Sequence, residues 1–449
     1  MEDQLEVDVK IISKEMVKPS FPPLSNPTTF TLPFIDQIFP TFHIPLLLYY
    51  TSNPSTQQGE IDISGLKTSL SQTLDQFLPL AGRLMDESTI SCNNEGIPLI
   101  ETKVNCHLSV ALTSPHKVKL LPKFLPPPDL QASGLQPISE LVPLAFQINV
   151  FVCGGVVIGC YMLHKFLDAG SIGTFFRYWS ALNSKRLQDL APPHFEATVN
   201  AFPPYPKKEH IPSFNALDLL PHPTQTKLTF AIKSFIFDTS SINILKTKAA
   251  SKLIYKPTGF EVVLGFLWEH ILATKHNLSL QVERTSVTIA VNMRPRMSPP
   301  LPRESMGNII ITPNVLVPEE SNNNKFQELV KEIHSTLSTT YKKINSRIFQ
   351  GENAKVELLR SMAPVDGALI VSSWCKMGLN EADFGFGKPI WIVPTDGKQT
   401  PLLVTNVCCM TDYCHPIIGD GIEAWLMLEE KEMDYLESNA DFLAFASPN

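Results

Sequence analysis

The pattern of apolar and polar positions along the chain predicts a mixture of helices and strands. Between residues 66 and 80, apolar side chains recur at helical spacing, and Pro79 and Gly82 end the segment. Residues 142–162 hold a nearly continuous apolar run, which is typical of a centrally buried strand. We also expect a helix at 169–182, strands at 227–237 and 286–291, and helices at 259–275 and 326–344. This mixture predicts an α/β protein with segregated helices and large mixed sheets.

The length and the placement of proline predict the domain organisation. A chain of 449 residues is too long for one compact core and suits two domains of about 200 residues each. Prolines cluster between residues 191 and 224, where they remove backbone donors and disfavour helix in the preceding residue. We therefore expect an N-terminal domain at 1–190, a proline-rich linker at 191–224 and a C-terminal domain at 225–449.

Composition and charge exclude several classes of protein. Hydrophobic residues make up 43% and charged residues 18%, which is ordinary for a globular protein. The net charge is −7 and the longest basic run is the pair Lys207-Lys208, so we expect no nucleic-acid partner. The apolar run at 151–163 is shorter than the roughly 20 residues of a spanning helix, so we expect no membrane segment. Without a recognisable targeting signal, a cytoplasmic monomer with reduced thiols is expected.

The most informative local pattern is His164-Lys-Phe-Leu-Asp168, at the end of the predicted buried strand and before a helix. A histidine with an ordinary pKa of about 6.5 is largely neutral at cellular pH and is suited to act as a general base. Asp168 stands where a carboxylate can cap the next helix. The same spacing also fits a buried histidine satisfied by the backbone and an ordinary capping aspartate. The spacing alone does not decide between them.

A second pattern, Asp383-Phe-Gly-Phe-Gly387-Lys-Pro, invites two misleading comparisons. It contains Asp-Phe-Gly, but the sequence has none of the other protein-kinase motifs. It is not a phosphate-binding loop, because Lys388 is followed by proline and not by serine or threonine. The segment is therefore interpreted as a turn, with Gly385 and Gly387 flanked by buried aromatic side chains.

Together the two patterns resemble the hallmarks of the plant BAHD acyltransferase family, H-x-x-x-D-G and D-F-G-W-G. The resemblance covers essentially the whole chain, in the same order. Further matching segments are Pro22-Pro-Leu-Ser, Thr31-Leu-Pro-Phe-Ile-Asp36, Leu78-Pro-Leu-Ala-Gly-Arg-Leu84, Val291-Asn-Met-Arg294, Gly307-Asn308 and Ser372-Ser-Trp374. Two positions depart from the family pattern: Ala169 precedes Gly170, and Phe386 replaces the usual tryptophan. Neither departure removes a reactive group.

The resemblance implies a fold and an activity. The fold would be chloramphenicol acetyltransferase-like, with two similar-sized domains and an active-site channel between them. The activity would be direct transfer of an acyl group from acyl-CoA, as co-substrate, to a small-molecule hydroxyl, without a permanently bound cofactor. The segment Arg303-Glu-Ser-Met-Gly-Asn lacks the pattern of the anthocyanin-malonylating branch. The sequence is more similar to the vinorine synthase-like branch of alkaloid acetyltransferases, which favours acetyl-CoA and an alkaloid acceptor.

The resemblance also implies roles for individual residues. His164 would be the base, and Trp374 and Ser372 would stabilise the oxyanion, although Trp374 fits a packed core tryptophan equally well. Asp168 would pair with Arg294 and hold the His164 loop. Asp383, Gly385 and Gly387 would be structural. Candidates for the phosphates of coenzyme A are Lys246, Lys248 and Lys252, a cluster that is also typical of a solvated helix face.

Other chemistries find less support in the sequence. The absence of a G-x-S-x-G motif disfavours a serine hydrolase. Cys408, Cys409, Cys414 and His415 suggest zinc, but they lack C-x-x-C and H-E-x-x-H spacing, so buried cysteines and no metal are expected. Two alternatives stay open. One is a relative that binds a small molecule without catalysis, and the other is a transferase that uses a larger acyl-CoA on a terpenoid or phenolic alcohol.

Overall fold

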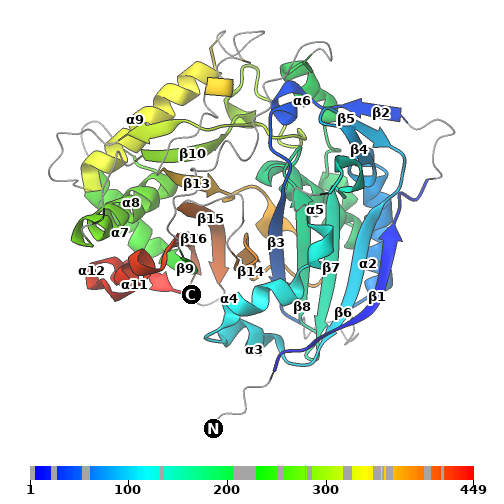
Figure 1. Ribbon diagram of the computed structural model, residues 1–449, viewed down its shortest axis with the longest axis horizontal. Helices are drawn as coiled ribbons and strands as arrows, with labels where there is room; N and C mark the ends of the chain where they lie inside the picture. The colour runs from blue at the N-terminus through cyan, green and yellow to red at the C-terminus, as the bar shows by residue number, and fades with distance from the viewer. Residues whose placement is uncertain are drawn as a thin grey trace. The chain divides into compact units, whose positions relative to one another are not determined.

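The computed structural model describes most of the chain (Figure 1). The described residues are 6–21, 28–52, 61–131, 136–205, 229–250, 256–278, 280, 286–316, 326–346, 355, 358–360, 368–398, 406–415 and 419–449. The chain forms two compact units. Unit 1 comprises Met1–Ser213, Pro302–Ile309 and Lys376–Gly397, and unit 2 comprises Phe214–Leu301, Ile310–Cys375 and Lys398–Asn449.

Unit 1 contains a six-stranded sheet in the order β1-β6-β7-β8-β3-β14, in which only the β6–β7 pairing is parallel. These strands are β1 (Val9–Val17), β3 (His43–Tyr50), β6 (Ile97–Val104), β7 (Leu144–Phe151), β8 (Val156–Leu163) and β14 (Trp391–Val393). A smaller antiparallel sheet consists of β2 (Thr28–Thr31), β5 (Thr89–Cys92) and β4 (Arg83–Asp86). The helices are α1 (Phe34–Gln37), α2 (Ile63–Leu74), α3 (Leu108–Thr113), α4 (Lys117–Leu120), α5 (Ala169–Asn183) and α6 (Phe195–Ala201). Short 3-10 turns are η1 (Leu78–Ala81), η2 (Leu121–Phe124), η3 (Pro128–Leu130), η4 (Ile138–Glu140), η5 (Leu187–Asp189) and η9 (Leu379–Glu381).

Aromatic side chains of α5 form much of the core of unit 1. Phe146 of β7 packs against Phe175 and Trp179 with ring centroids 5.9 and 5.0 Å away. The Trp179 indole nitrogen donates to the Leu66 carbonyl oxygen of α2 at 3.2 Å, so the polar edge of this buried ring is satisfied. Burial of each such ring stabilises the fold by about 1.5–3 kcal/mol. This packing fixes the position of α5, whose first residue follows Asp168.

The expected strand at 142–162 is wrong in one respect, because the segment folds as two strands. β7 ends at Phe151 and β8 begins at Val156, and the two pair antiparallel. Gly154 in the connection has φ +78°, a conformation that favours glycine, and its amide donates to the Phe151 carbonyl oxygen at 2.9 Å. The apolar run concealed this turn, since glycine does not interrupt a hydrophobic pattern as a charged residue would.

Other elements of unit 1 follow the sequence closely. The helix predicted at 169–182 is confirmed by α5, with Asp168 as its N-cap. The helix predicted at 66–80 is shorter than expected, because α2 ends at Leu74 and residues 78–81 form the separate turn η1. Pro79 lies within η1, where its ring is incompatible with a continuous α-helix.

The division into units differs from the expected domains at two places. The motif around Asp383 lies in unit 1 and not in the C-terminal domain, because β14, which follows it, pairs with β3. Residues 302–309 also belong to unit 1, where Ser305 bridges to His194. The expected linker at 191–224 contains helix α6, and its residues 206–224 lie outside the described part.

Unit 2 is built on a mixed sheet in the order β11-β10-β13-β15-β16-β9-β17, with β12 also paired to β10. Its strands are β9 (Phe230–Asp238), β10 (Ser286–Asn292), β11 (Ile310–Ile311), β12 (Asn314–Leu316), β13 (Leu369–Ser373), β15 (Val407–His415), β16 (Gly419–Glu429) and β17 (Ser447–Pro448). Its helices are α7 (Thr239–Ala249), α8 (Gly259–Asn277), α9 (Phe326–Ile344), α11 (Glu430–Ser438) and α12 (Ala440–Leu443), with the 3-10 turn η7 (Arg294–Arg296). The predictions at 259–275, 286–291 and 326–344 are confirmed, and the strand predicted at 227–237 is confirmed from Phe230 onward.

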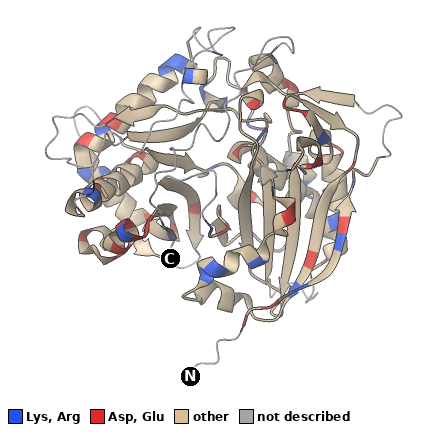
Figure 2. Ribbon diagram, in the orientation of Figure 1, with Lys and Arg blue, Asp and Glu red and all other residues tan. Residues whose placement is uncertain are grey.

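Several elements carry both acidic and basic residues, among them α9 with Glu328, Lys331, Glu332, Lys342 and Lys343 (Figure 2). Within the described ranges, no helix is both long and apolar enough to cross a membrane.

Candidate active site

His164 is the first residue after β8, and its main chain is held on both sides. Its amide donates to the Phe42 carbonyl oxygen at 2.7 Å, and its own carbonyl oxygen accepts from Asn308 Nδ2 at 2.8 Å. The half-buried imidazole lies near the rings of Phe39 and Phe42, with centroids 5.1 and 5.2 Å away. Nδ1 is fully buried, which leaves Nε2 as the nitrogen available to an incoming group.

The surroundings of His164 favour the neutral imidazole. Burial lowers its pKa below the ordinary value, because a charged ring would lose its hydration. The negative charge of Asp168 acts in the opposite direction, but the effect of burial is larger. A neutral imidazole can accept a proton, so the geometry and the electrostatics suit a general base.

Asp168 is buried and directs both carboxylate oxygens at backbone amides. Oδ1 accepts from the Ser171 amide at 2.8 Å in the first turn of α5, and Oδ2 accepts from the Ile309 amide at 3.1 Å. The capping position expected from the sequence is confirmed. The second contact ties the segment at 307–309, which is far away in sequence, to the end of the histidine motif.

The 307–309 segment makes further contacts that the sequence did not indicate. The Asn308 amide donates to Asp36 Oδ1 at 2.6 Å, and the Gly307 amide donates to Ser171 Oγ at 3.0 Å. Gly307 has φ +125°, and a Cβ there would lie 3.0 Å from Asp36 Oδ2. A glycine is required both by the backbone conformation and by this close approach.

Lys165, next to the histidine, is a buried cation that the sequence analysis passed over. Its Nζ donates to the carbonyl oxygens of Gln37 and Phe39 at 3.0 and 2.9 Å and lies 2.9 Å from Glu87 Oε2. A buried lysine needs such partners, because an unpaired charge inside a protein is strongly disfavoured. The signal in the sequence was a lysine within an otherwise apolar segment. Its effect is to anchor the residues that carry Phe39 beside the imidazole.

Ser372 and Trp374 lie at the end of β13 in unit 2 and contact each other. The indole Nε1 of Trp374 donates to Ser372 Oγ at 3.2 Å, and the Trp374 amide donates to the Met410 carbonyl oxygen at 2.7 Å. Trp374 is buried, whereas Ser372 is half-buried. A hydroxyl that accepts from the indole can still donate its own proton to a developing oxyanion.

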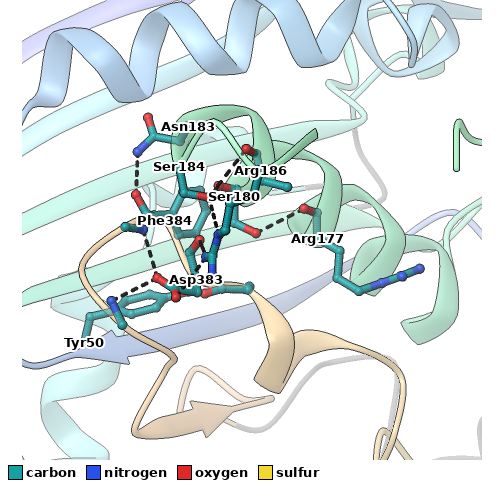
Figure 3. A network of polar contacts seen from close by, with 12 residues as sticks. Tyr50, Arg177, Ser180, Asn183, Ser184, Arg186, Asp383 and Phe384 are labelled. Atoms are coloured by element: carbon teal, nitrogen blue, oxygen red, sulfur yellow. Dashed lines mark hydrogen bonds and ion pairs between the residues drawn. The ribbon is translucent and has the colours of Figure 1, made fainter. Parts of the chain in front are cut away.

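The Asp383 motif forms a closed turn packed against the end of α5 (Figure 3). Asp383 Oδ1 accepts from the amides of Gly385 and Gly387 at 2.9 and 3.0 Å, and Oδ2 pairs with Arg186 Nη2 at 2.9 Å. Burial alone would raise the pKa of Asp383, but these hydrogen bonds and the Arg186 charge hold it below the ordinary value. Both glycines have positive φ, 100° and 104°, as the turn requires.

Aromatic rings anchor the same turn. The Phe384 ring lies 4.8 Å from Trp179 in an edge-to-face arrangement. Phe386 stacks on Phe384 at 5.7 Å and meets Tyr50 edge-on at 5.1 Å. The phenylalanine at 386 therefore occupies an aromatic cluster, as the tryptophan usual in the family could also do.

Four other candidate positions are less informative. Lys246 and Lys248 lie in the last turn of α7, and Lys248 Nζ sits 4.5 Å from the centre of the Phe445 ring. Lys252 lies outside the described residues. Arg294 in η7 is buried, and its amide and Nη1 both donate to Asn292 Oδ1, at 3.0 and 3.2 Å. Its expected pairing with Asp168 stays a prediction.

The cysteines do not form a metal centre or a disulfide in the described structure. Cys408 and Cys409 lie on β15, and burial raises the pKa of the Cys408 thiol well above its ordinary value. None of the eight cysteines is joined in a disulfide. Nowhere in the described part of the chain do three or more His, Cys, Asp or Glu residues gather so that they could hold a metal ion.

Comparison with known proteins identifies the class to which this fold and site belong. A family model described as "Transferase family" matches residues 7–443. The chain belongs to this family, the BAHD acyltransferases, and is an acyltransferase. Family members take the acyl group from an acyl-CoA. The expected family and enzyme class are thereby confirmed.

Individual relatives match over nearly the full chain. The chain is 32% identical to stemmadenine O-acetyltransferase from Catharanthus roseus, over 97% of both chains. It is also 32% identical to limonoid 21-O-acetyltransferase from Citrus sinensis, over 99% of both chains. Its structure is similar to the crystal structure of vinorine synthase, with a TM-score of 0.78 and 28% identity over 98% of both chains. The fold class expected from the sequence is confirmed by this likeness.

Proposed function

We propose that this chain transfers the acetyl group of acetyl-CoA to a hydroxyl of an alkaloid, with His164 as the general base. The observation that carries the proposal is the setting of the imidazole. Its main chain is held by Phe42 and Asn308, its Nδ1 is buried, and burial keeps the ring neutral. Acetyl transfer is supported by the names of the acetyltransferases at 32% identity.

In the proposed reaction, the acceptor hydroxyl gives its proton to His164 Nε2 as its oxygen attacks the thioester carbonyl. The resulting tetrahedral intermediate carries a negative oxygen, which accepts a hydrogen bond from the Ser372 hydroxyl, itself polarised by the Trp374 indole. The carbon–sulfur bond then breaks, and the leaving thiolate takes the proton from the imidazolium. General-base assistance of this kind contributes about 10²–10⁴-fold to the rate.

Other residues have supporting roles in this proposal. Asp168, together with Arg294, holds the histidine loop and does not itself transfer protons, since both its oxygens already accept backbone hydrogen bonds. Asp383, Gly385 and Gly387 stabilise the fold. Lys246, Lys248 and Lys252 contact the phosphates of coenzyme A. The enzyme is further proposed to act as a monomer, in the cytoplasm.

A terpenoid acceptor is the second candidate. The identity to the limonoid enzyme, 32%, equals that to the stemmadenine enzyme. Both classes of alcohol present a bulky apolar scaffold, which suits the phenylalanine rings beside His164. The acceptor class is therefore decided by assay and not by overall similarity.

The decisive experiment measures release of coenzyme A thiol from several acyl-CoAs, each with panels of alkaloid, terpenoid and phenolic alcohols. We expect acetyl-CoA with an alkaloid alcohol to give thiol and an ester of the corresponding mass.

The matched control is His164→Ala, which should retain the fold by circular dichroism and lose at least about 99% of kcat. Thiol release and ester formation in the variant at wild-type rates would remove His164 from the mechanism. If no acyl-CoA and acceptor pair gives an ester, but an alcohol binds, the chain is a non-catalytic binding relative.

A further inference from the structure

Two buried carboxyl groups hold successive backbone amides next to the candidate base. Asp36 Oδ1 accepts from the Asn308 amide at 2.6 Å, and Asp168 Oδ2 accepts from the Ile309 amide at 3.1 Å. Asp36 and Asp168 are only 2% and 3% exposed. If both of these buried carboxyl groups were ionised, their negative charges would repel each other strongly. The structure must therefore contain a feature that reduces this repulsion.

The surroundings of Asp36 show how the repulsion is avoided. Asp36 lies in the fully buried helix α1, and burial raises its pKa to about 8. Hydrogen bonds from Asn308 and the charge of Lys165 lower the pKa, whereas the negative charge of Asp168 raises it further. Asp168, by contrast, accepts hydrogen bonds from two backbone amides, those of Ser171 and Ile309. Asp36 is thus the member of the pair that carries a proton at neutral pH.

The segment held by the two carboxyls leads directly to the base. The Asn308 amide donates to Asp36 Oδ1 at 2.6 Å, and the Asn308 side chain donates to the His164 carbonyl oxygen at 2.8 Å. Gly307 fits between Asp36 and Thr198 with so little space that a Cβ would approach Asp36 Oδ2 to 3.0 Å and Thr198 Cγ2 to 3.1 Å. A shift of α1 or of the 307–309 segment would therefore move the backbone of His164.

We propose that Asp36, as a neutral carboxylic acid, is a positioning residue for His164, acting through the 307–309 segment. The inference deepens the proposed function, on whose assignment of His164 it rests. Asp36 touches neither the imidazole nor the proposed reacting atoms. Its contribution is to fix Asn308, whereas Asp168 fixes Ile309 and the start of α5.

The experiment compares three substitutions at the pair. Asp36→Asn keeps an acceptor for the Asn308 amide and resembles the neutral acid, so kcat should stay within about threefold of the wild type. Asp36→Ala removes the contact and should lower kcat about a hundredfold, with little change in the KM for acetyl-CoA. Asp168→Asn places an NH₂ group against a backbone amide that needs an acceptor, and it should lose activity as Asp36→Ala does.

A matched control separates positioning from loss of stability. Asp62 caps α2 by accepting from the Gly65 amide at 2.8 Å, so Asp62→Ala removes a carboxylate contact outside the candidate site. Its melting temperature should fall while its kcat does not. In Asp36→Ala, the imidazole should become less buried, so its pKa should rise toward the ordinary value of histidine. The pH at which kcat reaches its plateau should therefore also move upward. A purely structural role for Asp36 would leave that pH unchanged.

Stability as a function of pH gives a test that does not need an acceptor. A carboxyl whose pKa is raised in the folded state holds its proton more tightly than in the unfolded chain. Its contribution to stability therefore falls as the pH rises from about 4 to about 8. Asp168 and Lys165 are the charged groups acting on Asp36, and both remain in Asp36→Asn. The melting temperature of Asp36→Asn should accordingly fall less than that of the wild type over this range.

The outcomes are distinguishable. An Asp36→Ala variant that folds and keeps wild-type kcat would overturn the inference, as would an Asp36→Asn variant that loses as much activity as Asp168→Asn. If Asp36→Ala fails to fold, the comparison of the two asparagine variants decides. If wild-type protein and all variants show no transfer, the proposed function fails, while the dependence of melting temperature on pH still tests the proton on Asp36.

Discussion

The pH dependence of transfer should follow the protonation of His164. Burial lowers the pKa of this imidazole below its ordinary value of 6.5, and only the neutral ring can accept a proton. We expect kcat to rise with pH below 6.5 and to be constant from about pH 7 to 8. Initial rates at saturating substrate across pH 5 to 8 measure this. A plateau reached only well above pH 7 would contradict the buried setting of the base.

The same lowered pKa has a consequence for stability. Because the unfolded chain binds a proton at this histidine more readily than the folded one, His164 contributes stability at neutral pH that is lost as the pH falls through the folded-state pKa. This trend is opposite in sign to that of Asp36, whose pKa is raised. Wild-type melting curves alone would mix the two effects, so substitutions at each residue are needed to separate them.

Ser372 and Trp374 should contribute unequally if the hydroxyl is the group that meets the oxyanion. The indole donates to Ser372 Oγ at 3.2 Å, so it acts through the hydroxyl. We expect Ser372→Ala to lower kcat about a hundredfold and Trp374→Phe about tenfold. Ser373 is the control, since adjacent residues of a strand point to opposite faces, and Ser373→Ala should be near wild type. Wild-type kcat in Ser372→Ala would assign the oxyanion to other donors.

At the scale of single residues, the sequence identified groups with a recognisable pattern and missed groups defined by tertiary contacts. Asp168 was correctly placed as a helix cap, because capping depends on neighbouring residues. Lys165 and the partnership of Asp36 with Asn308 depend on segments brought together only by folding. A charged residue inside an apolar segment is the one signal that could have pointed to Lys165.

At the scale of elements, the Asp383 turn should behave as a structural unit. Asp383→Ala leaves the amides of Gly385 and Gly387 without their acceptor and should destabilise the protein by about 2 kcal/mol. Arg186→Ala removes the ion pair together with the hydrogen bonds to the Asp383 carbonyl oxygen and to Ser184 Oγ, but the arginine is half exposed, so the loss should be smaller. Denaturant unfolding measures both. A stable Asp383→Ala protein with a specific loss of kcat would instead place Asp383 in the chemistry.

Periodicity predicted long elements well and their interruptions poorly. Helices α5, α8 and α9 match their expected ranges closely, because each has apolar positions sustained over several turns. The apolar pattern predicts one strand where the chain forms the hairpin of β7 and β8, since Gly154 and Gly155 lie within an apolar run. A buried antiparallel hairpin and a single buried strand leave similar hydrophobic patterns, and only chain length distinguishes them.

At the scale of the whole molecule, the order of the chain is a poor guide to the composition of the units. Two segments from the second half of the sequence, residues 302–309 and 376–397, belong to unit 1. The first of these segments carries Gly307 and Asn308, and the second carries Asp383 and β14. Sheet pairing between β14 and β3 joins residues separated by most of the chain. Pairings over such distances cannot be deduced from local periodicity, and they explain why a boundary drawn only at the proline-rich segment was incomplete.

Transfer should be direct, through a complex that holds acyl-CoA and acceptor together, with no acyl-enzyme intermediate. A covalent route needs a nucleophile activated by an adjacent base. Among the described residues that surround His164, the contacts are with phenylalanine rings, Asn308 and backbone groups. Burial raises the pKa of the Cys160 thiol on β8, which makes this cysteine a poor nucleophile.

Two measurements test direct transfer together. Reciprocal plots of initial rate against acetyl-CoA at several acceptor concentrations should intersect, as expected when both substrates bind before the first product leaves. Intact-protein mass spectrometry after incubation with acetyl-CoA alone should show no added acetyl group, and His164→Ala should give the same spectrum as the wild type. Parallel plots, with a stoichiometric acetyl adduct that disappears on addition of acceptor, would establish a covalent mechanism. That result would exclude direct transfer with His164 as the base that deprotonates the acceptor. It would not change the membership of the chain in the acyltransferase family.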